Sequence, residues 1–284
     1  MFFIIGFVVL VASVLGGYLP HGKAEVLWQP FEFIIIIGSA IGGYIIGNPK
    51  DVLFKTGKAF TQVFKGTPHN RQHYVELLSL LYTLFKIAKQ KGNLGLEEHI
   101  EKPENSPVFK KFPTVIANHH AVVFLCDYIR LLTMGSENPH ELGDLIDEEI
   151  DTHHHELERV SGAITRMGDG LPAFGIVAAV LGVITTMGSI LEPPEVLGAL
   201  IGAALVGTFS GILLAYGLVA PIGAVLTSYA EDETKYFQCI KAGLIAHVQD
   251  YAPGVSVEFA RKVLFSNERP SFAELEKAVQ AAPA

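Results

Sequence analysis

Four long stretches of this sequence contain no Asp, Glu, Lys or Arg and are rich in apolar side chains. They run approximately over residues 1–19, 33–47, 171–190 and 197–226. A helix needs roughly 20 apolar residues to cross the hydrocarbon core of a bilayer. The second stretch reaches that length when it is extended back to Trp28, which leaves Glu32 at the membrane interface. We therefore predict an all-α integral membrane protein with four transmembrane helices.

The composition supports a membrane protein and argues against other classes. Hydrophobic residues make up 50% of the 284 residues, charged residues make up 18%, and the mean hydropathy is +0.37. The net charge of −8 and the lack of a concentrated Lys/Arg run argue against nucleic acid as a partner, because binding to phosphates needs a basic face. No Lys or Arg precedes the first apolar stretch, so we do not expect a cleaved signal peptide.

The positions of the basic residues predict the orientation of the chain. Of the 21 Lys and Arg residues, only Lys23 lies in the two short connections, at residues 20–32 and 191–196. Lys and Arg near membrane spans are retained on the cytoplasmic side, so both termini are expected in the cytoplasm. The predicted domains are spans one and two at 1–48, a cytoplasmic helical loop at 49–170, spans three and four at 171–227, and a cytoplasmic helical tail at 228–284.

Helix signals are strong in both predicted cytoplasmic parts, and no strand alternation of any length is present. Leucines recur through residues 74–91, two lysines occupy the last turn, and Gly92 follows as a stop signal. The sequence Ser271-Phe272-Ala273-Glu274 is a capping box, which predicts the start of a last short helix.

Two prolines and one glycine pair shape the predicted third and fourth spans. Asn138, followed by a proline and an acid, predicts a long helix that runs to about Met167. We expect the Gly-Asp-Gly segment at 168–170 to break it, so that Pro172 opens the third span at a harmless first-turn position. Pro221 lies well inside the fourth span, where it must kink the helix. That kink is either static or a hinge.

The predicted spans hold no Asp, Glu, Lys, Arg or His apart from Glu32 at an edge. Protons cross hydrocarbon through ionisable residues at membrane depth, and this chain supplies none. Either the chain moves no ions, or a second protein brings a carboxylate into a pocket that these helices build.

Hydroxyl and glycine patterns in the spans leave two alternatives each. Hydroxyl groups in spans three and four can line a polar path or bond to their own backbone four residues back. Small residues at four-residue spacing can pack helices closely within one subunit or between subunits. The hydroxyl groups belong to Thr185, Thr186, Ser189, Thr208, Ser210 and Tyr216, and the glycine pairs are Gly38/Gly42, Gly198/Gly202 and Gly207/Gly211.

No metal, cofactor or catalytic site is predicted. His153, His154 and His155 are consecutive on a helix and point about 100° apart, so they cannot converge on one ion. No nucleotide loop, nucleophile elbow or acid/base pair is present. Cys126 and Cys239 lie in predicted cytoplasmic regions, where we expect reduced thiols.

Three long motifs resemble the flagellar motor stator family MotA, within the wider MotA/TolQ/ExbB group of ion-driven membrane motors. They are GDGLPAFGIVAAVLGV at 168–183, VGTFSGILLAYG at 206–217, and YAPGVSVEFARKVLFSNERPSF at 251–272. The resemblance covers essentially the whole chain and implies a stator subunit of the bacterial inner membrane rather than an enzyme. It implies five copies around two copies of MotB, whose membrane helix carries the ion-binding aspartate.

The resemblance also assigns roles to individual residues. Pro172 and Pro221 match the two prolines that couple protonation of the partner aspartate to a conformational change. Thr208 matches the threonine that faces that aspartate. Ala179 stands where sodium-driven relatives have a second threonine, which favours H⁺ over Na⁺ as the transported ion.

A charged pair in the large loop completes the implied site. Lys89 and Glu97 match the pair that engages the rotor protein FliG, although well-known members have arginine at the first position. Lysine keeps the charge but loses the planar guanidinium fork. Solvated charges near a helix end are the alternative interpretation of both residues.

Three other functions remain open. A TolQ- or ExbB-like subunit would use the same ring to energise an outer-membrane system, but those relatives typically have three spans. A channel or transporter acting alone is disfavoured by the absence of a buried charge. A passive membrane scaffold would carry no ion flux.

Overall fold

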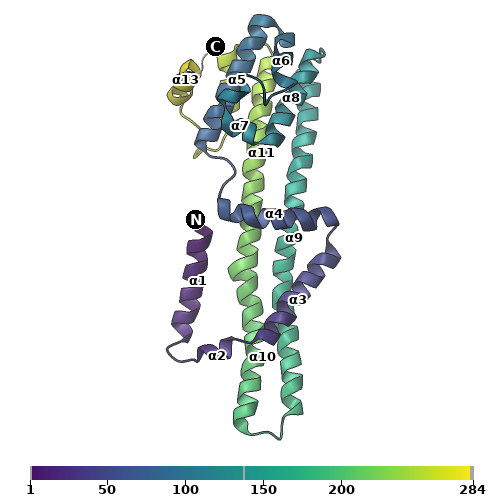
Figure 1. Ribbon diagram of the computed structural model, residues 1–284, viewed down its shortest axis with the longest axis vertical. Coiled ribbons are helices and arrows are strands. Elements are labelled where there is room, and N and C mark those ends of the chain that lie inside the picture. The colour runs from purple at the N-terminus through teal and green to yellow at the C-terminus, as the bar shows by residue number, and fades with distance from the viewer. Residues whose placement is uncertain (1, 137, 282–284) are drawn as a thin grey trace. The chain divides into compact units, whose positions relative to one another are not determined.

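The computed structural model describes residues 2–136 and 138–281, and every regular element in these ranges is a helix (Figure 1). This confirms the all-α fold class. The described chain divides into two compact units. The first comprises residues 2–66 and 156–228, and the second comprises 67–136, 138–155 and 229–281. Two long helices, α9 (Pro139–Gly188) and α11 (Ala220–Val248), contribute residues to both units.

The first unit contains the apolar helices. Helical stretches within Ala24–Gly47, Pro139–Gly188 and Pro194–Val248 are long and apolar enough to cross a membrane, whereas α1 is a shorter apolar helix of 17 residues. The number of four spans therefore stays a prediction. The elements are α1 (Phe2–Tyr18), α2 (Ala24–Leu27), α3 (Pro30–Gly47), α4 (Lys50–Lys65), part of α9, α10 (Pro194–Leu214), the π-helix η3 (Ala215–Val219) and the start of α11.

Helix α9 continues through the Gly-Asp-Gly segment at 168–170, so the predicted break there is wrong. The helix is unbroken over 50 residues. Glycine costs a helix about 1 kcal/mol relative to alanine. However, a Cβ at Gly168 would lie 3.1 Å from Val219 Cγ1, so glycine allows close packing at this position. Pro172 consequently lies inside a helix, not at its first turn as predicted, and it removes a backbone hydrogen bond there.

The second unit has a hydrophobic core built around α5. Residues Leu77, Leu80, Leu81, Leu84 and Phe85 on α5 are each at most 1% exposed and share one core with side chains of α8, α11 and α12. The leucine pattern that predicted this helix therefore marks its buried face. The elements are α5 (Arg71–Lys91), η1 (Asn93–Leu96), α6 (Glu97–Ile100), η2 (Phe109–Lys111), α7 (Pro113–Ala117), α8 (His119–Thr133), α12 (Pro253–Lys262) and α13 (Phe272–Ala281), with parts of α9 and α11.

The predicted helix ends are present. The side chain of Asn138 accepts hydrogen bonds from the first turn of α9, at 3.0 Å from His140 N. Glu274 N donates to Ser271 Oγ at 3.2 Å, and Ser271 N donates to the Glu274 carboxylate at 3.3 Å, which confirms the capping box. Gly92 ends α5 with a φ of +75°, a conformation that favours glycine.

A buried polar group anchors α11 in the second unit. Glu233 Oε2 lies 2.6 Å from His69 Nε2, and Asn118 Nδ2 donates to Glu233 Oε1 at 3.2 Å. Burial alone would raise the pKa of Glu233, but the hydrogen bonds from His69 and Asn118 outweigh burial and hold that pKa below its usual range. The ring of His69 also stacks on Tyr236, with centroids 4.0 Å apart. A charged carboxylate is thus satisfied inside this unit.

Both cysteines are free and buried, as expected for reduced thiols. Burial raises the pKa of Cys126 to about 12 and also raises the pKa of Cys239. Thiols with such raised pKa values are unreactive at neutral pH.

Candidate functional site

A seam of small residues joins α9 to α10 in the first unit. We define the α9–α10 seam as Gly175, Ala178 and Gly182 on α9 with Ala204, Gly207 and Gly211 on α10. A Cβ at Gly175 would lie 2.9 Å from the carbonyl oxygen of Gly207, and one at Gly211 would lie 2.9 Å from Gly175 Cα. The two backbones are therefore in direct contact, as small residues allow in membrane helices.

The three glycine pairs that the sequence singled out differ in their surroundings. Gly207 and Gly211 pack within the chain, against α9. In contrast, a Cβ at Gly38, Gly42 or Gly198 would meet nothing within 4 Å among the described residues. The alternative of packing within one subunit therefore holds for the pair at 207 and 211.

Thr208 and Ala179 lie at the same level of the seam. A Cβ at Gly175 would be 3.4 Å from Thr208 Cα, and a Cβ at Gly207 would be 3.4 Å from the backbone nitrogen of Ala179. Both Thr208 and Ala179 are half-buried. The structure thus places two of the residues that the sequence singled out beside the same seam.

The six hydroxyl groups that the sequence singled out in the spans fall into two sets. Thr185 Oγ1 donates to the carbonyl oxygen of Leu181 at 3.0 Å, and Thr186 Oγ1 donates to that of Gly182 at 2.8 Å. These two threonines therefore bond to their own helix. Within the part of the chain that the structure describes, the hydroxyl groups of Thr208, Ser189, Ser210 and Tyr216 make no hydrogen bond, so that of Thr208 is available to a ligand or partner.

Pro221 follows a defect in the helix. The residues just before it, η3, form a turn of π-helix in which Ala220 N donates to the carbonyl oxygen of Ala215. Pro221 has no N–H to donate to the carbonyl oxygen of Gly217 one turn earlier. The backbone between α10 and α11 is therefore irregular in the region where the sequence predicted a kink.

The two prolines weaken the backbone at one level of the first unit. Pro172 has no N–H for the carbonyl oxygen of Gly168. A Cβ at Gly168 would lie 3.1 Å from Val219 Cγ1 and 3.5 Å from the nitrogen of Ala220, next to Pro221. The weakened turn of α9 thus packs against the π-helical turn of the neighbouring helix. The sequence did not indicate that the turn weakened by Pro172 would pack against the π-helical turn before Pro221.

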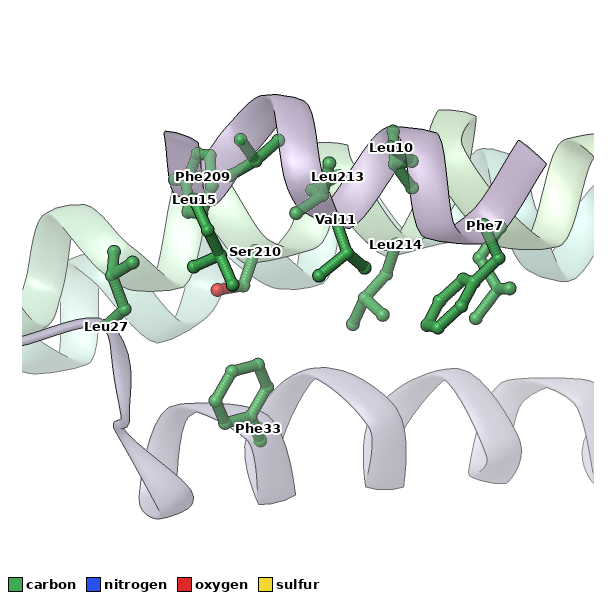
Figure 2. A pocket seen from close by; sticks show the side chains of 12 residues that line it. Phe7, Leu10, Val11, Leu15, Leu27, Phe33, Phe209, Ser210, Leu213 and Leu214 are labelled. Carbon is green, nitrogen blue, oxygen red and sulfur yellow. The ribbon is translucent and has the colours of Figure 1, made fainter. Parts of the chain in front are cut away.

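An apolar cavity of about 220 Å³ lies beside α10, between α1, α2 and α3. Figure 2 shows Phe7 and Leu10 of α1, Phe33 of α3, and Leu213 and Leu214 of α10 around it. The hydroxyl of Ser210 is the polar group at its edge. These side chains can pack against an apolar group, but none of them can act as an acid or a base.

Lys89 is paired inside the second unit. Its Nζ donates to the carboxylate of Asp250 and, at 3.2 Å, to the carbonyl oxygen of the same residue. The hydrogen bond from Lys89 holds the pKa of Asp250 below its usual range. Asp250 is itself 91% exposed. Glu97 is exposed at the start of α6 and lines a shallow hollow with Lys91.

The histidine run does not form a metal site in the described residues, where no three His, Cys, Asp or Glu side chains are grouped to hold an ion. His154 Nδ1 instead lies 2.8 Å from Thr234 Oγ1 on α11. The ring centroids of His120 and His153 are 5.9 Å apart.

Comparison with known proteins covers nearly the whole chain. The family model for the motility protein A N-terminal region matches residues 4–92, and the model for the MotA/TolQ/ExbB proton channel family matches residues 117–239. Motility protein A of Salmonella typhimurium is 43% identical over 282 residues, which cover 99% of this chain and 96% of that protein. The chain belongs to the motility protein A family. Another relative, the chemotaxis protein LafT of Vibrio parahaemolyticus, is 36% identical over 96% of each chain.

Solved structures of the family share the fold. The C. jejuni MotAB structure matches with a TM-score of 0.78 at 23% identity, over 95% of this chain and 98% of that chain. The flagellar MotAB stator complex from Bacillus subtilis matches with a TM-score of 0.73 at 23% identity, over 90% and 92%.

Two features of the site were missed from the sequence. Gly168, Gly175 and Gly182 recur every seven residues, which is a signal for one face of a packed helix, yet the four-residue glycine pairs drew attention instead. The pairing of Lys89 with Asp250 joins residues 161 positions apart, and no local pattern indicates it.

Proposed function

We propose that this chain is the ion-channel and torque subunit of a flagellar stator. The observation that carries the proposal is 43% identity to motility protein A over 99% of the chain. The match of residues 4–92 to the motility protein A N-terminal model favours a stator over a TolQ- or ExbB-like subunit. The proposed location is the bacterial inner membrane, with both termini in the cytoplasm.

A MotB-type protein is the proposed partner, because the solved neighbours are MotAB complexes. Five copies of this chain would surround two copies of the partner. The partner would supply the ion-binding aspartate, since the predicted spans carry no carboxylate beyond Glu32 at an edge.

Thr208 is the proposed contact for that aspartate. Its hydroxyl makes no hydrogen bond to any described residue, whereas Thr185 and Thr186 use theirs on their own helix. Ala179, at the same level of the seam, supplies no hydroxyl ligand for a sodium ion. Protons are therefore the proposed transported ion.

Pro172 and Pro221 are the proposed coupling elements. Protonation of the partner aspartate removes a charge near Thr208. A charge that falls through 100 mV releases about 2.3 kcal/mol, which is about four times the thermal energy. The weakened turns at Gly168 and η3 pack together, so a small shift at either one can bend α9 relative to α11. Each bend would advance the ring by one step.

Lys89 and Glu97 are the proposed rotor contacts, with FliG as the rotor protein. Asp250, which pairs with Lys89, is 91% exposed, so solvent screens the pair and a rotor carboxylate can compete for the ammonium group. Glu97 is exposed and can meet a basic rotor group.

Swimming under separately collapsed ion gradients tests the proposed function. The chain and its partner are expressed in cells whose own stator is deleted. We expect swimming to stop when the proton gradient is collapsed and to persist when the sodium gradient is collapsed. Loss with sodium alone would overturn the proton assignment. Failure to swim under any gradient, in cells where the pair is shown to assemble, would contradict the stator function.

A Thr208→Ala variant should lose most of its proton flux and swimming speed. A hydrogen bond to a charged group contributes about 1.5–3 kcal/mol, and the variant removes that bond from the ion pathway. The matched control is Thr185→Ala, whose hydroxyl is already bonded to Leu181. Proton flux is measured as acidification of the cytoplasm in cells that express the pair. Equal flux in the two variants would remove Thr208 from the pathway.

A further inference from the structure

Helix α4 carries an apolar surface that the rest of the described chain does not cover. Val52, Thr56 and Val63 form its buried face. Phe54 and Phe64 point away from that face, and they are 81% and 58% exposed. Large exposed aromatic side chains on an amphipathic helix are typical of helices that lie in a membrane interface.

The same exposed side of α4 carries unpaired positive charge. Lys50, Lys58 and Lys65 are exposed and make no ion pair with any residue that the structure describes. The other basic residue of the helix, Lys55, is paired with Glu156 at 2.9 Å. This helix of 16 residues therefore exposes three positive charges, although the net charge of the chain is −8.

Helix α4 directly follows the end of an apolar helix. The apolar helix α3 ends at Gly47, and α4 begins at Lys50 only two residues later. Figure 1 shows α4 running across the direction of α9 and α10. The ring of Phe64 contacts Phe3 at the start of α1, with centroids 5.3 Å apart. The end of α3, the start of α1 and α4 therefore lie close together in the first unit, at what the proposed topology makes the cytoplasmic surface of the membrane.

We propose that α4 binds anionic phospholipids of the cytoplasmic leaflet. The lysines would pair with phosphate headgroups while Phe54 and Phe64 enter the acyl boundary. A second copy of this chain is a poorer occupant, because its α4 would bring the same unpaired positive charges. The assignment of the cytoplasmic side rests on the proposed topology, whereas lipid binding itself does not depend on torque generation.

Electron paramagnetic resonance of spin-labelled lipids tests this proposal. The complex of this chain with its MotB-type partner is reconstituted in bilayers of phosphatidylethanolamine and phosphatidylglycerol. The immobilised fraction of spin-labelled phosphatidylglycerol is compared with that of spin-labelled phosphatidylcholine. We expect a preference for phosphatidylglycerol on the order of threefold to tenfold, which decreases at high salt.

Three variants distinguish the effect of the lysine charges on lipid binding from an effect on folding. The Lys50→Gln, Lys58→Gln, Lys65→Gln variant should lose most of the preference, and the corresponding Lys→Arg variant should keep it. The matched control, Lys102→Gln, Lys110→Gln, Lys277→Gln, removes the same charge from exposed positions elsewhere and should also keep it. No preference in the unmodified complex, or an unchanged preference in the first variant, would overturn the proposal. Because the assay does not require swimming, a failed stator assignment would leave its result intact.

Discussion

A Gly211→Val variant is expected to abolish swimming and to lower the thermal stability of the purified complex. A Cβ at Gly211 would lie 2.8 Å from the carbonyl oxygen of Leu171 and 2.9 Å from Gly175 Cα. Carbon atoms pack at about 3.5–4.0 Å, so α9 and α10 would have to separate by about 1 Å. Overpacking of this kind costs about 1–3 kcal/mol, and here the obstructing atoms belong to the backbone and cannot rotate away.

The same separation would displace Thr208 from Ala179, because the two residues lie at the level where these backbones touch. Thermal stability is measured as the temperature at which half of the complex loses its folded state. The matched control is Gly198→Val on the same helix, where a Cβ would meet nothing within 4 Å of the described chain. If Gly211→Val and Gly198→Val behaved alike in both assays, the close seam would have no role in function.

A Pro172→Ala variant is expected to stop rotation while the complex still assembles. Alanine restores the N–H that can donate to the carbonyl oxygen of Gly168, and a proline inside a helix costs about 3 kcal/mol. The straightened helix would therefore be favoured by an amount comparable with the 2.3 kcal/mol that one proton supplies at 100 mV. The motor would lack the energy to bend α9 at each step.

Assembly of the Pro172→Ala variant is measured by co-purification with the partner, and rotation by the speed of tethered cells. Pro194→Ala serves as control, because Pro194 is an exposed first-turn residue of α10 and its removal changes no interior hydrogen bond. Normal rotation in Pro172→Ala would refute the coupling role of this proline. A complex that fails to assemble would show a structural role instead.

Local chemistry in the sequence was sufficient for much of the fold. Asn138 and the Ser271 capping box predicted helix starts that the structure contains, and Gly92 predicted the end of α5. Each of these signals acts within one helical turn, where the hydrogen-bond partners are sequence neighbours. The leucines of α5 predicted a helix, and the structure places them on its buried side, because burial repeats with the helical period.

The site residues could be nominated from the sequence, but their arrangement could not. Thr208, Ala179, Pro172 and Pro221 were singled out by resemblance, and nothing in their spacing indicated that the first two share one level of the seam. That the weakened turn at Gly168 packs against η3 likewise depends on how α9 and α11 are aligned.

Tertiary packing decided the features that sequence signals predicted wrongly or left open. Two glycines at 168 and 170 normally favour a helix end, yet α9 passes through them, because the absence of a Cβ at Gly168 lets the helix approach Val219. The threonine hydroxyls could bond to their own backbone or line a polar path, and the structure shows the backbone bond for Thr185 and Thr186 but not for Thr208. The sequence determined which segments are helical and apolar, since those properties are local. The fold determined which glycines touch, since that depends on a neighbouring helix that is distant in sequence.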